Sequence, residues 1–180
     1  MISVLLVDDE PVLLDIGRMF LERTGDFRVG EAESGLVALQ RMNSDSYDAV
    51  VADYEMPEMD GLALLRKVRE SWPDIPYILF TGRGREEVVI EALNSGADFY
   101  LQKGGDPKAQ FTELAHKIRQ AVLTRKASSD LKESEETFRQ FFDAAGDAIF
   151  ILDRDRITDC NMKALDILGR SREDVIGKDP

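Results

Sequence analysis

The chain is poor in the residues that build covalent and soft-metal sites, with a single cysteine, Cys160, and a single histidine, His116. One cysteine excludes an intrachain disulfide and a cysteine-rich zinc site. The sequence also lacks a run of about 18 apolar residues, and it has no basic start followed by an apolar stretch. We therefore expect no signal peptide and no direct membrane insertion, and we expect a cytoplasmic location.

Basic residues are also scarce, because 23 lysines and arginines face 35 aspartates and glutamates, for a net charge of −12. Nucleic-acid-binding domains usually carry a basic face, so no nucleic-acid partner is expected. Hydrophobic content of 43% and charged content of 32% are ordinary for a globular protein. A length of 180 residues is enough for one full domain and part of another.

Short apolar runs alternate with segments of helical periodicity through the first two thirds of the chain. Strands that alternate with helices indicate a parallel sheet, because each crossover between parallel strands needs a connecting helix. The pattern predicts an α/β fold with a doubly wound, five-stranded parallel sheet. The expected strands cover residues 2–7, 27–32, 49–53, 76–81 and 98–103, and the expected helices begin near residues 13, 35, 62, 86 and 108.

The helix expected after Pro107 is unusually long, since neither glycine nor proline occurs from Lys108 to Ala145. Its two halves each carry apolar residues at three- and four-residue spacing, one residue out of phase with each other. This favours a coiled-coil stem with a phase slip, through which residues 107–145 of two copies could form a homodimer. The alternative is an ordinary last helix and a loose linker, broken at residues 127–130.

Charged and polar side chains follow the expected strands at their carboxyl ends. Asp8 and Asp9 follow the first strand, Asp53 follows the third, and Thr81 and Lys103 end the fourth and fifth. In a doubly wound sheet these ends converge in one crevice. Three close carboxylates repel one another, and Mg²⁺ is the hard cation that relieves this while leaving room for a phosphate.

The chemistry that this set favours is phosphoryl transfer to an aspartate, with the lysine and the threonine holding the phosphoryl oxygens. Two alternatives remain at this point: a purely structural acidic cluster, and a magnesium-dependent phosphatase of similar topology. Such phosphatases resemble a D-x-D-x pattern after the first strand, whereas this chain has Asp8-Asp9-Glu10 there. That difference argues against the phosphatase.

Residues 1–122 resemble the receiver domains of two-component response regulators, which have a flavodoxin-like fold. The resemblance rests on the acidic pair, the stretch D-Y-E-M-P-E-M-D-G that begins at Asp53, the Thr81-Gly82 step and Lys103. From Asp9 onward these positions are separated by 44, 28 and 22 residues. Each position alone is weak evidence for this family, whereas the ordered set is specific to it.

The resemblance implies a role for each position. Asp53 is then the phosphoacceptor, Asp9 binds Mg²⁺ directly with Asp8 nearby, and Asp53 and the backbone carbonyl of Glu55 complete the protein ligands. Thr81 and Lys103 hold the phosphoryl group. Tyr100, three residues before the lysine, takes the place of the family's switch aromatic.

The chain departs from the family pattern at two places. Receivers commonly have proline after the lysine, and here Gly104 follows. Glu55 and Arg83 occupy the two positions that usually tune the lifetime of the phosphoryl group. We expect them to pair across the mouth of the site and slow attack by water.

Residues 133–180 resemble the start of a PAS sensor domain. Strands are expected at 148–153 and 157–160, Asn161 is expected to cap a short helix at 162–168, and Ser171 with Asp174 resembles a capping box. The later helix and the three remaining strands of a PAS sheet are missing, so we expect a truncated α+β segment without an assignable ligand. The expected domains are a receiver (1–122), a helical stem (123–137) and the N-terminal part of a PAS domain (138–180).

These features together predict a response-regulator receiver that takes its phosphoryl group from a histidine kinase and relays the signal through the last helix to a PAS- or kinase-type output. No turnover of a separate substrate is expected. His116 is interpreted as a solvated helix residue, because the sequence has no ATP-binding domain to serve a phosphotransfer histidine. A third alternative is a pseudo-receiver, a scaffold that dimerises without phosphorylation.

Overall fold

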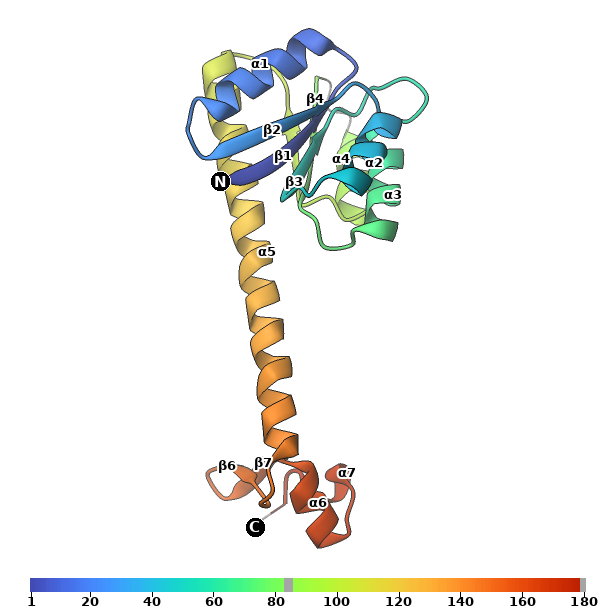
Figure 1. Ribbon diagram of the computed structural model, residues 1–180. Helices are drawn as coiled ribbons and strands as arrows, with labels where there is room; N and C mark the ends of the chain where they lie inside the picture. Colours follow the sequence, from blue (N-terminus) through green and yellow to red (C-terminus); the bar gives the residue numbers. More distant parts are fainter. Residues whose placement is uncertain (83–85, 179–180) are drawn as a thin grey trace. The chain divides into compact units, whose positions relative to one another are not determined.

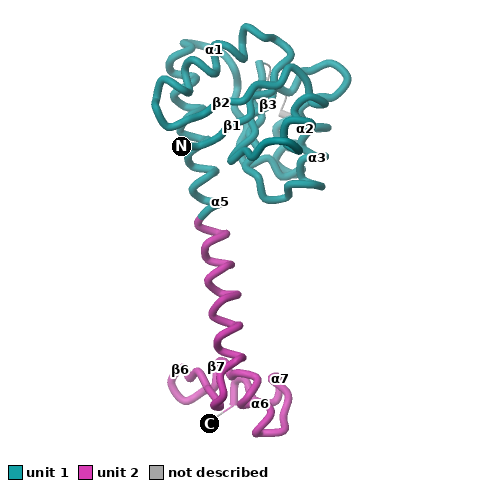
Figure 2. Tube along the Cα trace, in the orientation of Figure 1, with its two compact units in different colours: residues 1–126 teal, residues 127–180 magenta. Residues whose placement is uncertain are grey.

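The computed structural model describes residues 1–82 and 86–178, and the chain divides into two compact units, residues 1–126 and 127–180 (Figure 2). The first unit contains a five-stranded sheet whose strands all pair in parallel. Its strands are β1 (Ile2–Val7), β2 (Phe27–Ala32), β3 (Ala49–Ala52), β4 (Tyr77–Thr81) and β5 (Phe99–Gln102), in the spatial order β2-β1-β3-β4-β5.

Helices cover both faces of this sheet (Figure 1). One core lies under α1 and the first part of α5, and includes Leu14 and Ile118. The other lies under α2, α3 and α4, and includes Leu64 and Val88. Burial on both faces explains why the strands are nearly continuous apolar runs, and the predicted doubly wound fold is confirmed. The helices are α1 (Pro11–Glu22), α2 (Gly35–Ser44), α3 (Gly61–Ser71), α4 (Glu86–Asn94) and α5 (Pro107–Ala144).

The predicted element boundaries are wrong by one or two residues in several places. The third strand ends at Ala52 instead of Asp53, and the fourth begins at Tyr77 instead of Pro76. The first helix begins at Pro11 instead of near Leu13, because proline lacks the N–H that would be unpaired in a first turn. None of these shifts moves a predicted strand away from its place in the sheet.

Helix α5 is continuous from Pro107 to Ala144, so the alternative with a break at residues 127–130 is wrong. Within the first unit its basic side chains reach two loops: Arg119 pairs with Asp26 at 2.7 Å, and Arg125 pairs with Asp74. Every residue from 126 to 141 is exposed. No helix in residues 1–82 or 86–178 is both long enough and apolar enough to cross a membrane.

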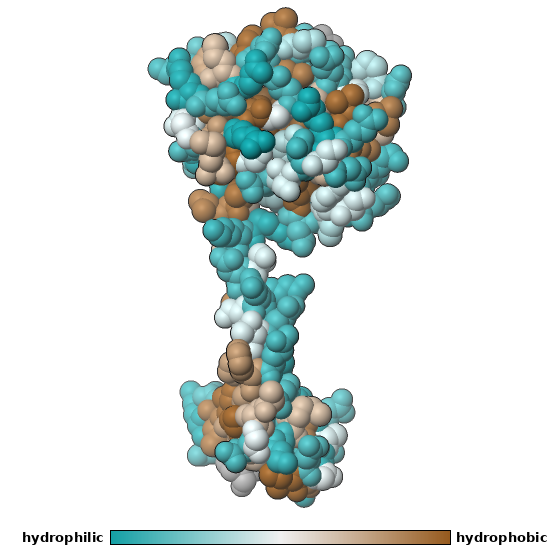
Figure 3. Space-filling model, viewed as in Figure 1, coloured by the Kyte–Doolittle hydropathy of each residue, from teal (hydrophilic) through white to brown (hydrophobic). Residues whose placement is uncertain are grey.

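The second unit ends in a small α+β arrangement. An antiparallel pair, β6 (Phe150–Asp153) and β7 (Arg156–Cys160), is followed by α6 (Met162–Leu168) and α7 (Arg172–Val175). Its core is small and contains Ile157, Cys160, Ala164 and Val175. Strand β6 is exposed along its whole length, and apolar side chains are visible over this unit in Figure 3.

Asn161 organises this unit more than the sequence indicated. Its side-chain oxygen accepts the N–H of Ala164 at 3.0 Å, which confirms the predicted cap, and also the N–H of Ile149 at 2.9 Å. The predicted capping box at Ser171 is wrong in form. The Ser171 hydroxyl donates to Asp174 at 2.6 Å and makes no cap bond to the backbone.

Candidate functional site

Backbone hydrogen bonds bring the predicted site residues together at the carboxyl edge of the sheet. The N–H of Asp53 donates to the carbonyl of Val7 at 2.8 Å, and the N–H of Asp8 donates to Ala32 at 3.1 Å. The N–H of Lys103 donates to the carbonyl of Thr81 at 2.7 Å. The parallel ladder therefore extends one residue past each strand and fixes where these side chains start.

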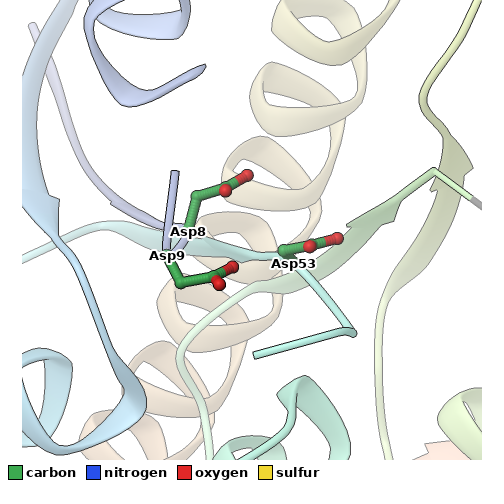
Figure 4. Close-up of side chains that lie close together, drawn as sticks. All are labelled: Asp8, Asp9 and Asp53. Carbon is green, nitrogen blue, oxygen red and sulfur yellow. The ribbon is translucent and has the colours of Figure 1, made fainter. Parts of the chain in front are cut away.

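Three carboxylates cluster at this edge. Asp8, Asp9 and Asp53 each offer one oxygen, and these oxygens all lie within 4.8 Å of one another (Figure 4). Asp8 is 7% exposed and Asp53 is 9% exposed, whereas Asp9 faces solvent. The cluster is therefore partly buried and open on one side, which suits a cation that keeps several waters.

Among residues 1–82 and 86–178, Lys103 supplies the one ammonium group that pairs with this cluster. Its Nζ lies 2.5 Å from Oδ2 of Asp8 and 3.3 Å from Oδ1 of Asp53. The other oxygen of Asp8 accepts the N–H of Glu10 at 3.0 Å. Although Oδ1 of Asp53 is within ion-pair distance of the ammonium, it has no aligned hydrogen bond within the described residues. One lysine thus balances only one of the two buried carboxylates.

The pKa of Asp53 is raised above its ordinary value. Burial is the largest cause, and the neighbouring charge of Asp8 adds to it, while Lys103 acts in the opposite direction. Burial and a like charge both disfavour the ionised carboxylate. Positive charge bound beside Asp53 would therefore be favoured.

Two hydroxyl groups of the first unit are buried without a hydrogen-bond partner in the part of the chain that the structure describes. They belong to Thr81, which is 1% exposed, and to Tyr100, which is half-buried against the core under α2, α3 and α4. Burial raises the pKa of Tyr100. Thr81 is the last residue of β4 and lies beside Lys103. A bound oxyanion could accept a hydrogen bond from its hydroxyl group. The expected switch role of Tyr100 stays a prediction.

The loop after Asp53 is shaped by a close backbone approach that the sequence did not reveal. A Cβ atom at Gly61 would lie 2.3 Å from the carbonyl oxygen of Asp53, so only glycine fits there. Asp60 caps α3, accepting the N–H of Ala63 at 2.7 Å. The sequence pattern Asp60-Gly61 indicates a turn and a helix cap, and it gives no sign of the tight contact with the strand end.

Tyr77 also supports this loop. Its hydroxyl group is buried and donates to the carbonyl of Gly61 at 2.8 Å. Burial holds the pKa of Tyr77 well above its ordinary value, so the hydroxyl remains a donor. Tyr77 stands in an apolar run, and nothing in the sequence distinguished it from a core residue.

The remaining predicted residues lie in loops at this edge. Glu55 is exposed, two residues beyond Asp53. The pairing expected between Glu55 and Arg83 involves a residue outside the described ranges. Gly104 and Gly105 have φ values of +146° and +81°, which proline cannot adopt, so the departure from the family's proline has a backbone reason.

A doubly wound sheet with an acidic cluster, a lysine and a buried hydroxyl at its carboxyl edge is typical of α/β domains of the receiver class. Residues 4–117 match the family model described as the response regulator receiver domain, so the chain belongs to that family. Residues 136–180 match a PAS domain model. Receiver domains of this family act in two-component signalling, and the predicted resemblance to both families is confirmed.

Known proteins agree with this assignment. The chain is 32% identical to response regulator Rre1 of a Synechocystis species over 143 residues, which cover 78% of this chain and 60% of Rre1. It thus spans little more than half the length of the curated relatives it matches.

Two solved structures share the fold of the first unit. A response regulator receiver domain protein from Clostridium thermocellum is 29% identical with a TM-score of 0.63, over 71% of this chain and 98% of that one. Response regulator TrrA from Thermotoga maritima, solved in complex with Mg²⁺-BeF, is 30% identical with a TM-score of 0.59. The match covers 67% of this chain and 99% of TrrA.

Proposed function

We propose that the first unit accepts a phosphoryl group on Asp53 from a histidine kinase, in a reaction that depends on Mg²⁺. The observation that carries the proposal is the cluster itself. Two of its three carboxylates are buried, and a single ammonium lies between them. Membership of the receiver family supports the same chemistry.

The residues present fit a magnesium ion. Carboxylate oxygens are the hard ligands that Mg²⁺ prefers, and Asp9 faces solvent, where bound waters can stay. Asp8, Asp9, Asp53 and the backbone carbonyl of Glu55 would hold the ion. When bound, Mg²⁺ would neutralise negative charge on the incoming phosphoryl group.

Residues of the chain would carry out the phosphoryl transfer itself. A carboxylate oxygen of Asp53 attacks phosphorus, and the bond from phosphorus to the kinase histidine nitrogen breaks, which returns the electron pair to that nitrogen. Lys103 and Thr81 would hold the phosphoryl oxygens, since the ammonium already faces Asp53 and the Thr81 hydroxyl lacks a partner among the residues described. The Tyr100 side chain would turn inward when the Thr81 hydroxyl moves toward the phosphoryl group.

Intact-mass spectrometry after treatment with acetyl phosphate tests the proposal. We expect a gain of one phosphoryl group with Mg²⁺, no gain with EDTA, and no gain in Asp53→Asn. Asp45→Asn, at an exposed aspartate of the same unit, is the matched control and should be labelled like the wild type. Labelling of Asp53→Asn at the wild-type rate would refute the assignment.

An assay with an aryl phosphate, together with the magnesium dependence of labelling, separates the two alternative functions. A phosphatase would turn over a generic aryl phosphate, and we expect no such turnover, since receiver-family membership favours self-modification. A pseudo-receiver would show no response to magnesium, which the complete acidic set argues against.

We further propose how the chain is divided and where it works. Residues 1–122 would be the receiver, 123–137 the stem and 138–180 the N-terminal part of a PAS domain, in the cytoplasm. The exposed stretch of α5 carries Leu131, Phe138 and Phe141, which favours a homodimer through this helix. Phosphorylation would change that pairing and so reach the PAS-like segment.

A further inference from the structure

A cavity adjoins the acidic cluster and shares Asp8, Asp53 and Lys103 with it. Its volume is about 310 Å³, and it lies between the sheet, α1 and the first turns of α5. This volume falls at the lower end of the range for small-molecule sites, roughly 300–1,000 Å³. A flat molecule of about ten non-hydrogen atoms would fill a good part of it.

Aromatic packing preforms the wall of this cavity. The ring of Phe111 stacks on Phe20, with centroids 5.2 Å apart, and meets the edge of Phe80 at 5.9 Å. Leu6 and Leu14 complete the apolar lining. Since Phe111 is held from two sides, it cannot swing into the space without losing both contacts.

A glycine on α1 allows the wall of the cavity to pack closely. A Cβ atom at Gly17 would lie 2.8 Å from Cδ1 of Leu6 and 3.4 Å from the Phe111 ring, so any side chain there would push on the wall. Gly104 also lines the cavity, and no atom comes within 4 Å of the place where its Cβ would stand.

The few polar groups of the lining decide which ligand fits. They include Lys103, Asp8 and Asp53, and also the half-buried amide of Gln110. The two carboxylates oppose an anion when no metal is bound, and a charge of either sign placed among the apolar side chains would lose its hydration without gaining a partner. The amide of Gln110 can donate and accept hydrogen bonds without a charge.

We propose that this cavity binds a small, uncharged, mostly apolar molecule with one hydrogen-bonding group, held at the mouth by Gln110. The site shares Asp8, Asp53 and Lys103 with the proposed phosphorylation site but does not depend on that function. Binding should be measurable on the unphosphorylated chain without metal.

Titration with indole, followed by ¹H–¹⁵N NMR of the full chain, tests the proposal. We expect saturable shifts centred on Gly17, Gly104 and Gln110, and intermolecular NOEs from indole to Leu14 and Phe111. Indole-3-carboxylate, the anionic match, should bind about tenfold more weakly or not at all.

Two variants on the same helix sharpen the test. Gln110→Trp should plug the mouth and weaken indole binding at least about tenfold, whereas Thr112→Trp, at an exposed position outside the cavity, should leave it within about twofold. No saturable shift in the wild type, or equal binding by both variants, would overturn the proposal. If Gln110→Trp fails to fold, the wild-type NOEs decide by themselves. Labelling of Asp53 is measured separately, so failure of either proposal leaves the other visible.

Discussion

The environment of the Asp53 carboxylate opposes its ionisation, because burial and Asp8 together outweigh Lys103. A raised pKa in the folded state means that the folded chain binds more protons than the unfolded chain in the carboxyl range. The ionised group therefore costs stability at neutral pH when no metal is bound. We predict that Asp53→Asn raises the free energy of unfolding of the metal-free protein by on the order of 1 kcal/mol at pH 7.

Urea unfolding in EDTA measures this effect, and its pH dependence checks the cause. The gain should shrink as the pH falls through the carboxyl range, because wild-type Asp53 then becomes neutral as well. Asp45→Asn, at an exposed position, should change stability little at any pH. A destabilised Asp53→Asn would mean that Lys103 dominates the local electrostatics.

Gly61 is a second residue whose replacement should have a large effect, because its backbone contacts the end of the strand that carries Asp53. In Gly61→Ala the new Cβ would meet the Asp53 carbonyl oxygen at 2.3 Å and Cδ1 of Leu79 at 2.7 Å. We predict a loss of about 1–3 kcal/mol in the free energy of unfolding, as is typical of overpacking. Acetyl phosphate labelling should also slow, since Asp53 must move to relieve the contact.

Gly146→Ala is the control for this change. No atom lies within 4 Å of a Cβ at Gly146, so chemical denaturation should show a change within about 0.5 kcal/mol. A Gly61→Ala variant as stable as this control would show that the loop after Asp53 adjusts freely.

The positions of site residues could be predicted from sequence where their side chains follow strand ends. Contacts between two backbone segments could not be predicted. Asp8, Asp53 and Lys103 could be placed together because the carboxyl ends of parallel strands share an edge. The contact of Gly61 with Asp53, and the hydroxyl of Tyr77 that braces it, depend on how a loop folds back. Neither residue leaves a periodic signal, so neither could be found in advance.

At the scale of elements, α5 raises the question of how a helix stays formed without packing. Residues 126–141 are all exposed, whereas in proteins most helical stability comes from packing of an apolar face. A second copy packed along Leu131 would supply the missing burial. We predict that Leu131→Gln weakens dimerisation about tenfold or more, as sedimentation equilibrium would measure.

The control is Ser129→Gln, two residues away and therefore on the opposite side of the helix. It should leave the association constant unchanged within about twofold. A wild-type chain that sediments as a monomer throughout, with or without beryllofluoride, would remove the proposed dimer altogether.

Elements could be predicted well from the sequence because their signals are redundant. Strands β1, β3 and β4 are apolar runs bounded by turn residues, and the absence of glycine and proline from Lys108 to Ala145 predicted one long helix. The ends were less certain, because capping depends on single contacts. Asn161 caps as expected, whereas Ser171 donates its proton to Asp174 and caps nothing.

At the scale of the whole molecule, α5 is the one element that belongs to both compact units, since the boundary at Lys126 falls inside it. A signal that travels along the backbone must pass through residues in this helix that pack on neither core. Proline in a helix interior removes a hydrogen bond and clashes with the preceding turn, at a cost of about 3 kcal/mol. Ser128→Pro should therefore interrupt the connection without disturbing either core.

We predict that Ser128→Pro is labelled by acetyl phosphate at a rate within about twofold of the wild type, because the site lies wholly within residues 8–103. Hydrogen–deuterium exchange would then be compared with and without beryllofluoride. In the wild type and in Ser128→Ala, which keeps the helix, exchange in residues 142–178 should respond to beryllofluoride. In Ser128→Pro that response should be lost. A response that survives the proline would mean that the units communicate by another route, and reduced labelling would mean that the stem supports the site itself.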